Sequence, residues 1–365
     1  MKLNWLLLFI PVGIGLAWYE VNPIVVFLTS ALAIIPLAGL MGDATEALAK
    51  FLGHTLGGLL NATLGNAPEI IIGLFALKQG LVEMVKASIT GAIVGNLLFG
   101  LGLSVFVGGL KFPKLTYDIQ TARVNGQLLM LATFGLIVPA VFNFSTASER
   151  EISLEISIAL FLIYLASIVY TLFSGKPTPG EDAAKPVSPP MERPTETSET
   201  QSETEATGWS RNKALGILAA VTVALAVMSE ILTDAVDPAA KNLGLTPLFA
   251  GVFLLALVGN TADLINSVRF ARQNQLNISI GITVGSSTQM ALLVAPILVF
   301  FGFVFGRDMN LLFSPFELVA IIMPVVVFQT NANIGTAVWL GGLMLITIYF
   351  MLGFGFYYAP ATAGG

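Results

Sequence analysis

The chain contains no cysteine and a single histidine, His54, and both scarcities narrow its chemistry. Without cysteine there is no disulfide, no thiolate metal site and no cysteine nucleophile. One histidine cannot build a zinc site from several imidazoles, and no partner motif accompanies it as in a hydrolase triad. We therefore expect a protein that is not an enzyme and that carries no resident cofactor.

Charged residues are also scarce. Only 11% of the 365 residues are charged and 55% are hydrophobic, with a mean hydropathy of +0.84. Soluble domains carry about 25% charged residues. The composition therefore predicts an all-α polytopic membrane protein with the lipid bilayer as its surroundings. The net charge of -5 does not favour nucleic acid, which is not expected as a partner.

The most informative stretch is Gly65-Asn66-Ala67-Pro68-Glu69, which sets an acid inside an otherwise apolar run. A carboxylate at the centre of a membrane span costs on the order of 3 kcal/mol, so it indicates function, with a hydrated cavity or a bound cation as its partner. The i, i+3 spacing puts the Asn66 amide and the Glu69 carboxylate on one helix face. Gly65 and Pro68 weaken the helix and leave a main-chain carbonyl free.

The same pattern returns 194 residues later as Gly259-Asn260-Thr261-Ala262-Asp263. The offset also maps Gly91 onto Gly285, so it extends beyond the motif. An internal repeat with polar interruptions at matching places is typical of a carrier whose site lies between its halves. The alternative is that the amides and acids only join helices by hydrogen bonds, as polar residues in membrane bundles often do.

The apolar segments fall into two sets of five. We expect an N-terminal transmembrane helix in 1–21, a first five-helix repeat in 22–174, a second in 211–358 and a tail in 359–365. The total is about eleven spans of the length that a bilayer requires. Because five is an odd number, the second repeat enters the membrane from the opposite side, which is the inverted-repeat plan of secondary carriers.

The first two segments each have a particular feature. The stretch from Leu3 to Tyr19 is similar to a signal peptide, but bulky aromatic residues stand where a cleavage site needs small ones, so we interpret it as a membrane span. The next segment runs from Pro23 to Leu60 and is expected to break near Gly39 and Gly42.

Between the repeats, residues 175–210 are rich in Pro, Thr, Ser and Glu. This acidic segment has almost nothing apolar to bury and is expected to be a flexible linker, with a regulatory cation-sensing role as the second interpretation. With the N-terminus inside, twelve of the 17 Lys and Arg residues fall on the cytoplasmic side. We expect that orientation in the plasma membrane of a prokaryote, and a homo-oligomer is compatible with the sequence.

A polar stripe follows the predicted helix around Glu46. Asp43, Glu46, Lys50 and His54 share one helix face opposite apolar residues. This stripe could line an aqueous path to Glu69. It could equally be a solvated helix end in which Glu46 and Lys50 pair with each other at i, i+4.

Over nearly its whole length the chain resembles the cation/proton exchanger family of the calcium/cation antiporters. The motifs that carry the resemblance are Gly65 to Glu69, Met41-Gly42-Asp43-Ala44-Thr45-Glu46, Lys86-Ala87-Ser88-Ile89-Thr90-Gly91 and Gly285-Ser286-Ser287-Thr288-Gln289. The acidic linker is a trait of the family as well. The resemblance implies two inverted five-helix repeats plus one N-terminal helix, which exchange Ca²⁺ for protons.

The resemblance also implies which residues form the site. Glu69 and Asp263 stand at the positions of two essential carboxylates. Their neighbours are the oxygen donors and glycines of both repeats: Asn66, Asn260, Ser286, Gln289, Gly65 and Gly259. Glu46 and Glu230 resemble acids on a polar access path for protons and cations. We place Asp43 and Asn96 on the same path.

The second motif departs from the family pattern, which has Glu followed by His where this chain has Asp263 and Leu264. The shorter carboxylate reaches one methylene less. Ca²⁺ tolerates such a change through its flexible shell of about 6 to 8 oxygens, whereas the smaller Mn²⁺ could prefer it.

Two facing carboxylates can be neutralised by one divalent cation or by two protons. In a poorly solvated cavity the pair is stable with the cation or with the two protons bound, whereas the empty ionised pair is unfavourable. The exchange of one for the other is therefore obligatory. Rocking of one half against the other would expose the site to each side in turn. The alternatives are sodium-coupled calcium exchange, an exchanger that prefers Mn²⁺, and a cation channel, which would need oligomerisation to form a ring of acids.

Overall fold

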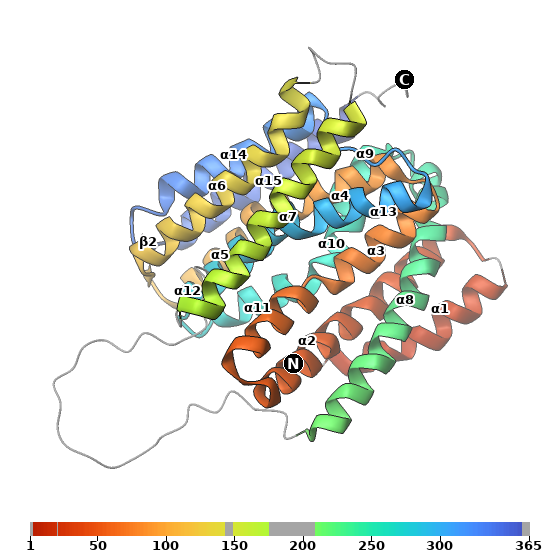
Figure 1. The fold of residues 1–365 in the computed structure, drawn as a ribbon, viewed down its shortest axis with the longest axis horizontal. Helices are drawn as coiled ribbons and strands as arrows, with labels where there is room; N and C mark the ends of the chain where they lie inside the picture. The colour runs from red at the N-terminus through yellow and green to blue at the C-terminus, as the bar shows by residue number, and fades with distance from the viewer. Residues whose placement is uncertain (1–2, 20, 143–148, 175–208, 360–365) are drawn as a thin grey trace.

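The structure is a computed structural model that describes residues 3–19, 21–142, 149–174 and 209–359. Most of the predicted linker thus lies outside the described residues. In the first half, after a 3-10 segment at Leu3–Leu8, the helices are α1 (Phe9–Trp18), α2 (Pro23–Leu64), α3 (Ala67–Lys78), α4 (Val82–Val94), α5 (Leu101–Lys111), α6 (Ile119–Phe142) and α7 (Glu149–Ser174) (Figure 1). The second half contains α8 (Arg211–Asn242), α9 (Pro247–Phe249), α10 (Ala256–Gly259), α11 (Thr261–Ala271), α12 (Leu276–Gln289), α13 (Ala295–Phe305), α14 (Pro315–Asn331) and α15 (Trp339–Tyr358).

Three π-helical segments connect successive helices without a loop. They are Gly95–Gly100 between α4 and α5, Ala250–Leu255 between α9 and α10, and Met290–Val294 between α12 and α13. A π-helical turn adds one residue to a helical turn, and such turns often occur at functional sites. The segments therefore mark where the helices lose their regular register.

The length and composition of the helices are those of a protein that crosses a membrane several times. Among the described residues, seven helices are long and apolar enough to span a bilayer, or up to eight if the bent pair Pro247–Gly259 and Thr261–Ala271 forms one span. Two shorter apolar helices, Trp5–Trp18 and Pro315–Asn331, accompany them. Outward side chains such as Val304, 73% exposed, suit lipid rather than water. The predicted all-α membrane fold is confirmed, and the total of eleven spans stays a prediction.

The predicted break in the second segment was wrong in its position. α2 runs without interruption through Gly39 and Gly42, and its non-helical residue is Gly53, with φ 78° and ψ 172°. That backbone conformation is costly for any residue with a β-carbon, so glycine suits it. Gly39 and Gly42 stay helical because lipid offers their backbone groups no partner other than the helix itself. The break thus falls at Gly53 rather than near Gly39 and Gly42.

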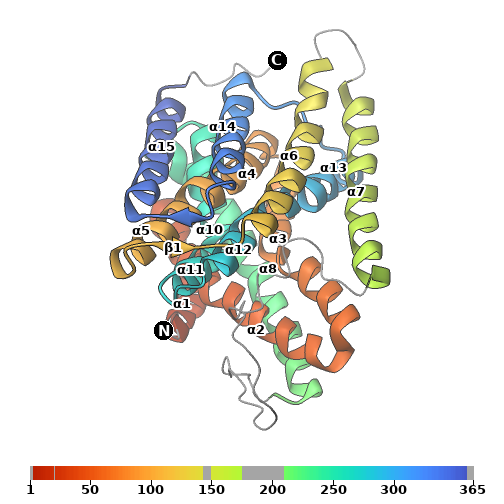
Figure 2. The same cartoon turned by 90° about the vertical axis from the view of Figure 1, so that its left-hand side faces the viewer.

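A two-stranded ribbon joins the two halves at one end of the helix bundle. β1 (Leu115–Thr116) precedes α6 and pairs antiparallel with β2 (Thr336–Ala337), which precedes α15. The Tyr117 hydroxyl donates to the carbonyl of Asn331 at 2.6 Å, which ties the same two loops together. Figure 2 shows the ribbon beside the start of α15. We call this end of the molecule the ribbon end.

The halves also touch backbone to backbone where α4 crosses the segment Ala250–Leu255. A β-carbon at Gly91 would overlap the carbonyl oxygen of Val252, and one at Gly251 would overlap that of Met84. Small residues of this kind let membrane helices approach closely. α2 and α8 pack along each other in the lower part of Figure 1, with α1 beside them.

Candidate cation-binding site

Each repeat breaks a helix at its Gly-Asn motif. The first break falls at Gly65 and Asn66, between α2 and α3, and the second at Asn260, where α10 and α11 meet at a bend of 60°. The carbonyl of Asn66 accepts the first bond of its new helix from Ile70 N–H at 3.0 Å. The carbonyl of Asn260 accepts the equivalent bond from Leu264 N–H, also at 3.0 Å. The repeated sequence is thus a repeated backbone geometry.

Both acids lie in the first turn of the helix that follows the break. Glu69 is the third residue of α3, and Asp263 is the third residue of α11. The N-terminus of a helix carries a partial positive charge, which favours a carboxylate in that turn. The two carboxylates are also close enough to repel each other. The fold therefore brings two acids from distant parts of the sequence to one place inside the bundle.

The two carboxylates have different partners. Ser286 on α12 makes a hydrogen bond with the Asp263 carboxylate. In contrast, Oε2 of Glu69 is buried and has no hydrogen-bond partner among the described residues. A buried carboxylate oxygen without a donor is costly as an anion, and a proton or a cation removes that cost. Glu69 is therefore the group at this site that most needs a positive charge.

Amide side chains from both repeats surround the acids. The Asn66 amide donates to Oε1 of Gln289, at the end of α12. The Asn96 amide donates to Oδ1 of Asn260 at 2.9 Å and to Oγ of Ser286 at 3.1 Å. The three asparagines are buried. They place neutral oxygen atoms inside an apolar bundle, and oxygen ligands are what hard divalent cations prefer.

Two of these amides belong to irregular turns. Asn96 is the second residue of the π-helical segment Gly95–Gly100, and Gln289 comes immediately before the π-helical segment Met290–Val294. The helices that face the two motifs thus lose their regular register at the level of the acids.

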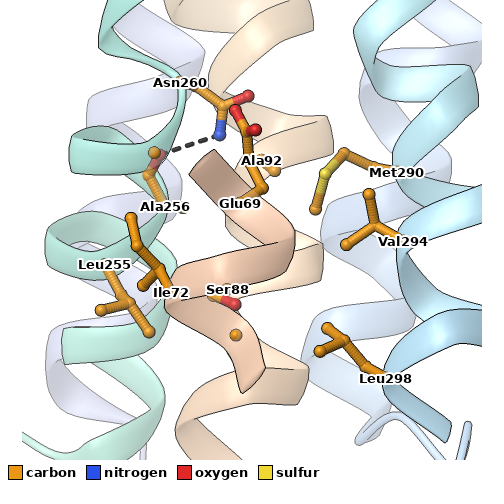
Figure 3. A pocket seen from close by; sticks show the side chains of 12 residues that line it. Glu69, Ile72, Ser88, Ala92, Leu255, Ala256, Asn260, Met290, Val294 and Leu298 are labelled. Carbon is orange, nitrogen blue, oxygen red and sulfur yellow. Dashed lines mark hydrogen bonds between the residues drawn. The ribbon is translucent and has the colours of Figure 1, made fainter. Parts of the chain in front are cut away.

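A small cavity of about 20 Å³, with room for about one water molecule, lies beside Glu69 (Figure 3). Gly259 forms part of its wall, since a β-carbon there would come within 3.2 Å of Cγ of Glu69. Most of the remaining wall is apolar and comes from both repeats: Ile72, Leu255, Met290, Val294 and Leu298. Such walls screen charge poorly, so an ion in the cavity would interact strongly with Glu69 and with the nearby amide of Asn260.

The structure brings most of the predicted site residues together. The group that meets around the two breaks consists of Glu69, Asp263, Asn66, Asn260, Gly259, Ser286 and Gln289. Asn96, predicted on the access path, instead lies within this group. Gly65 is exposed at the break itself. Among the described residues no three acidic or histidine side chains gather into a metal-binding cluster, so the site has two carboxylates and relies on amides for further oxygens.

The acids predicted for the access path lie outside this group. Asp43 and Glu46 are exposed on α2, and Glu46 pairs with Lys50 at 3.3 Å, as a solvated helix end would. Glu230 is exposed on α8 and pairs with Lys78 at 3.8 Å. The side chain of His54, the last member of the predicted stripe, is outside the described part of the structure.

Besides apolar wall residues, the sequence interpretation missed two cavity-lining side chains that carry an oxygen or a sulfur atom, those of Ser88 and Met290. Ser88 donates to the carbonyl of Val85 at 2.7 Å within α4 and also lines the cavity. It could have been found as a hydroxyl within a recognised motif. Met290 carries no such signal, because it is one of 11 methionines in an apolar sequence.

The comparisons with known proteins agree with one another. The chain matches the family described as sodium/calcium exchanger protein over residues 22–173 and 213–358. It is 39% identical to the Ca(2+)/H(+) antiporter of Aphanothece halophytica, over 98% of this chain and 96% of that one. It is 38% identical to the Ca(2+)/H(+) antiporter ChaA of Bacillus subtilis, over 91% and 92%. The solved structure of native YfkE has a TM-score of 0.81 and 33% identity, over 98% of this chain and 100% of that one.

Proposed function

The chain belongs to the sodium/calcium exchanger protein family, and from this premise we propose that it is a secondary antiporter that exchanges Ca²⁺ for protons. Relatives named as Ca(2+)/H(+) antiporters support the choice of ions. The observation that supports the site is the buried Oε2 of Glu69, which has no partner among the described residues and lies near a second acid, Asp263.

The pair formed by Glu69 and Asp263 accounts for the coupling. Two ionised carboxylates this close repel each other, and burial deprives both of water, so the empty charged pair is unfavourable. One divalent cation relieves the repulsion, and so do two protons. Because the site must be loaded before it moves between the two sides, neither ion leaks across alone.

The oxygen atoms around the acids suit Ca²⁺, which takes about 6 to 8 oxygen ligands in a flexible arrangement. The carboxylates of Glu69 and Asp263 supply the charge, and the side chains of Asn66, Asn260 and Ser286 supply neutral oxygens. Hydrogen bonds from the amides of Asn66 and Asn96 hold neighbouring oxygens in place before an ion arrives. Water completes the shell in this proposal.

Access to the two sides alternates in our proposal, by rocking of one group of helices against the other. The surroundings of Glu69 differ from those of Asp263, and this difference supports one state of such a cycle. Beside Glu69 there is the cavity, in whose wall Leu298 lies against Gly73. One turn beyond Asp263, Ser104 donates to Ser267 at 3.0 Å and joins the helices there.

Purified protein in proteoliposomes tests the proposed function. We expect Ca²⁺ uptake under an imposed pH gradient and none under an imposed Na⁺ gradient at equal pH. Competition by Mn²⁺ and Mg²⁺ then ranks the ions. Uptake driven by Na⁺ alone would replace the proposal with sodium-coupled calcium exchange, preference for Mn²⁺ would change the cargo, and flux without any counter-ion would indicate a channel.

The chain is a multi-pass membrane protein, and its bacterial relatives support placing it in the plasma membrane of a prokaryote. We further propose a cytoplasmic N-terminus in 1–21, repeats in 22–174 and 211–358, and a tether in 175–210. Reaction of single introduced cysteines with a membrane-impermeant thiol reagent would test this topology, since the natural chain has none.

A further inference from the structure

The ribbon end of the molecule is strongly basic. Five exposed basic side chains gather there from the ends of α5, α6, α11 and α12 and the loops between them: Lys111, Lys114, Arg123, Arg269 and Arg272. We call these five residues the basic patch. In residues 109–123, 269–277 and 331–339, which form this end, the only acid is Asp118. Positive charge therefore outweighs negative charge here.

Asp118 does not neutralise the basic patch. Its Oδ2 accepts a hydrogen bond from Thr121 N–H at 2.6 Å and so caps α6. Hydrogen bonds from the Thr121 side chain and main chain hold the pKa of Asp118 below its ordinary value. Lys111 Nζ donates to the main-chain carbonyl of Arg272 at 3.2 Å, so two basic residues of the patch are in direct contact. Arg123 Nε bonds to a neutral amide, that of Asn333, at 3.0 Å.

The opposite end of the molecule has a different charge pattern. Three of its basic residues pair with acids: Lys78 with Glu230 at 3.8 Å, Arg150 with Asp308 at 3.7 Å and Lys241 with Asp237 at 2.6 Å. Arg307 donates instead to the main-chain carbonyl of Lys78 at 2.9 Å. Among the residues that the structure describes, no member of the basic patch makes an ion pair. The patch is therefore able to attract an anion from outside the part of the chain that the structure describes.

Apolar side chains beside the basic patch indicate what kind of anion this is. Leu110 is 65% exposed next to Lys111, and Ile334 and Leu340 are half exposed or more on the other side of the ribbon. Trp339 lies against Gly109, with its ring edge-on to Phe106 at 6.4 Å. Apolar neighbours do not stabilise a bound free phosphate. They do stabilise a bound phospholipid, because its acyl chains cover them while its phosphate contacts the cations.

We propose that the basic patch binds the headgroups of anionic phospholipids, with the acyl chains against Leu110, Trp339 and Leu340. Lys111 and Arg272 contact the phosphate, and Lys114 and Arg123 extend the positive surface along the ribbon. The preference over zwitterionic lipid is expected to be about tenfold at low salt and to fall as salt rises. This proposal does not depend on which ions the protein exchanges.

The fluorescence of Trp339 provides the test. Replacing Trp5, Trp18 and Trp209 by Phe leaves it as the only tryptophan. Full-length protein is reconstituted in bilayers of phosphatidylcholine with increasing brominated phosphatidylglycerol, or in the reverse combination. Stronger quenching by the brominated anionic lipid, by about tenfold in relative binding constant, is expected. Charge removal by Lys111→Gln, Lys114→Gln and Arg272→Gln together should abolish the preference.

The matched control is Lys241→Gln, which removes a charge at the opposite end, where Asp237 already balances it. It should leave the quenching unchanged. Equal quenching by both brominated lipids, or a preference that survives the triple variant, would overturn the proposal. So would a preference that appears only after residues 181–205 are deleted, because the acidic segment would then be the occupant. If the single-tryptophan protein does not fold, native mass spectrometry of the unaltered chain in mixed micelles compares the same two lipids.

Discussion

The two repeats build the same break in a helix but surround it with different side chains. At Asn66 and at Asn260 the backbone turns in the same way, and an acid follows three residues later. Glu69, the longer acid, has a buried oxygen without a partner among the described residues, whereas Asp263, the shorter acid, is bonded to Ser286. The duplicated backbone thus determines where the two carboxylates lie, and the neighbouring helices determine which hydrogen-bond partners each carboxylate has.

The supporting helices differ between the repeats as well. At positions related by the 194-residue offset, Ser286 corresponds to Ala92, and Asn96 corresponds to Met290. Each repeat therefore lacks a polar group that the other provides, and Asn96 of the first repeat donates to Ser286 of the second. Neither half could form this hydrogen-bond network alone.

Loss of the first acid is the largest expected effect. Glu69→Gln keeps the shape of the side chain and removes the charge that would hold a cation, so Ca²⁺ uptake should fall to the level of empty liposomes while folding is kept. Asp308→Asn is the control, because that exposed acid pairs with Arg150 outside the site and should be replaceable with little loss of flux. Wild-type uptake by Glu69→Gln would contradict the proposal that the Glu69 carboxylate binds the cation.

The second acid decides whether the two motifs act as a pair. Asp263→Asn should also remove exchange, since one remaining charge cannot balance a divalent ion in a poorly solvated cavity. Asp263→Glu should keep exchange and favour Ca²⁺ over Mn²⁺, because the longer side chain permits a larger coordination shell. Uptake of both ions over a range of concentrations provides the measurement. Full exchange by Asp263→Asn would leave Glu69 as the sole carboxylate of the site.

Asn96 tests the network that joins the repeats. Asn96→Leu removes two hydrogen bonds and should weaken the apparent affinity for Ca²⁺ about thirtyfold, at roughly 1 kcal/mol for each bond. Maximal uptake should change much less. Thr222→Val, which removes a hydroxyl bonded within its own helix, is the control. An unchanged KM would show that the bonds to Asn260 and Ser286 do not prepare the site.

Exchanging proline and alanine at the matching position of the two motifs should have a small effect. Pro68 and Ala262 both occupy the second position of a helix, where the N–H makes no helical bond. Pro68→Ala and Ala262→Pro should therefore each cost less than about 1 kcal/mol and keep most of the uptake. Thermal unfolding and uptake measured on the same preparations would check this. Loss of exchange in Pro68→Ala alone would mean that the free carbonyl beside the proline binds the ion.

The smallest expected effect concerns the caps of α6 and α14, which correspond in the two repeats. Asp118 caps the first, and Ser314 caps the second together with Glu317. Removal of such a cap costs about 1 kcal/mol, and less at an exposed site such as Asp118. The pKa of Asp118 is lowered in the folded protein, so its contribution is present at neutral pH and is lost as the pH falls below about 4. Asp118→Asn should lower the unfolding temperature at pH 7 more than at acid pH. Ser210→Ala, which removes the neutral hydroxyl cap of α8, should not show that trend.

The parts of the site that could be predicted are those that the repeat itself carries. An acid inside an apolar run is informative, and its recurrence after 194 residues predicts both carboxylates and both asparagines as site residues. The role of Asn96 could not be predicted, because it depends on a π-helical turn that has no distinctive composition. Nor could the break at Gly53, since glycine also occurs at 39 and 42 and only the packing of α2 distinguishes among them.

Gly91 and Gly251 allow the two repeats to meet without any side chain between their backbones. A contact of this kind contains nothing that can change rotamer, so it cannot be lengthened or shortened by small steps. α4 and the segment Ala250–Leu255 therefore keep a fixed spacing and move as one rigid body. We expect the motion of the transport cycle to be taken up where side chains separate the helices, with the axis of rotation near this crossing. Even the methyl group of alanine at either glycine would push the two copies apart at their fixed point.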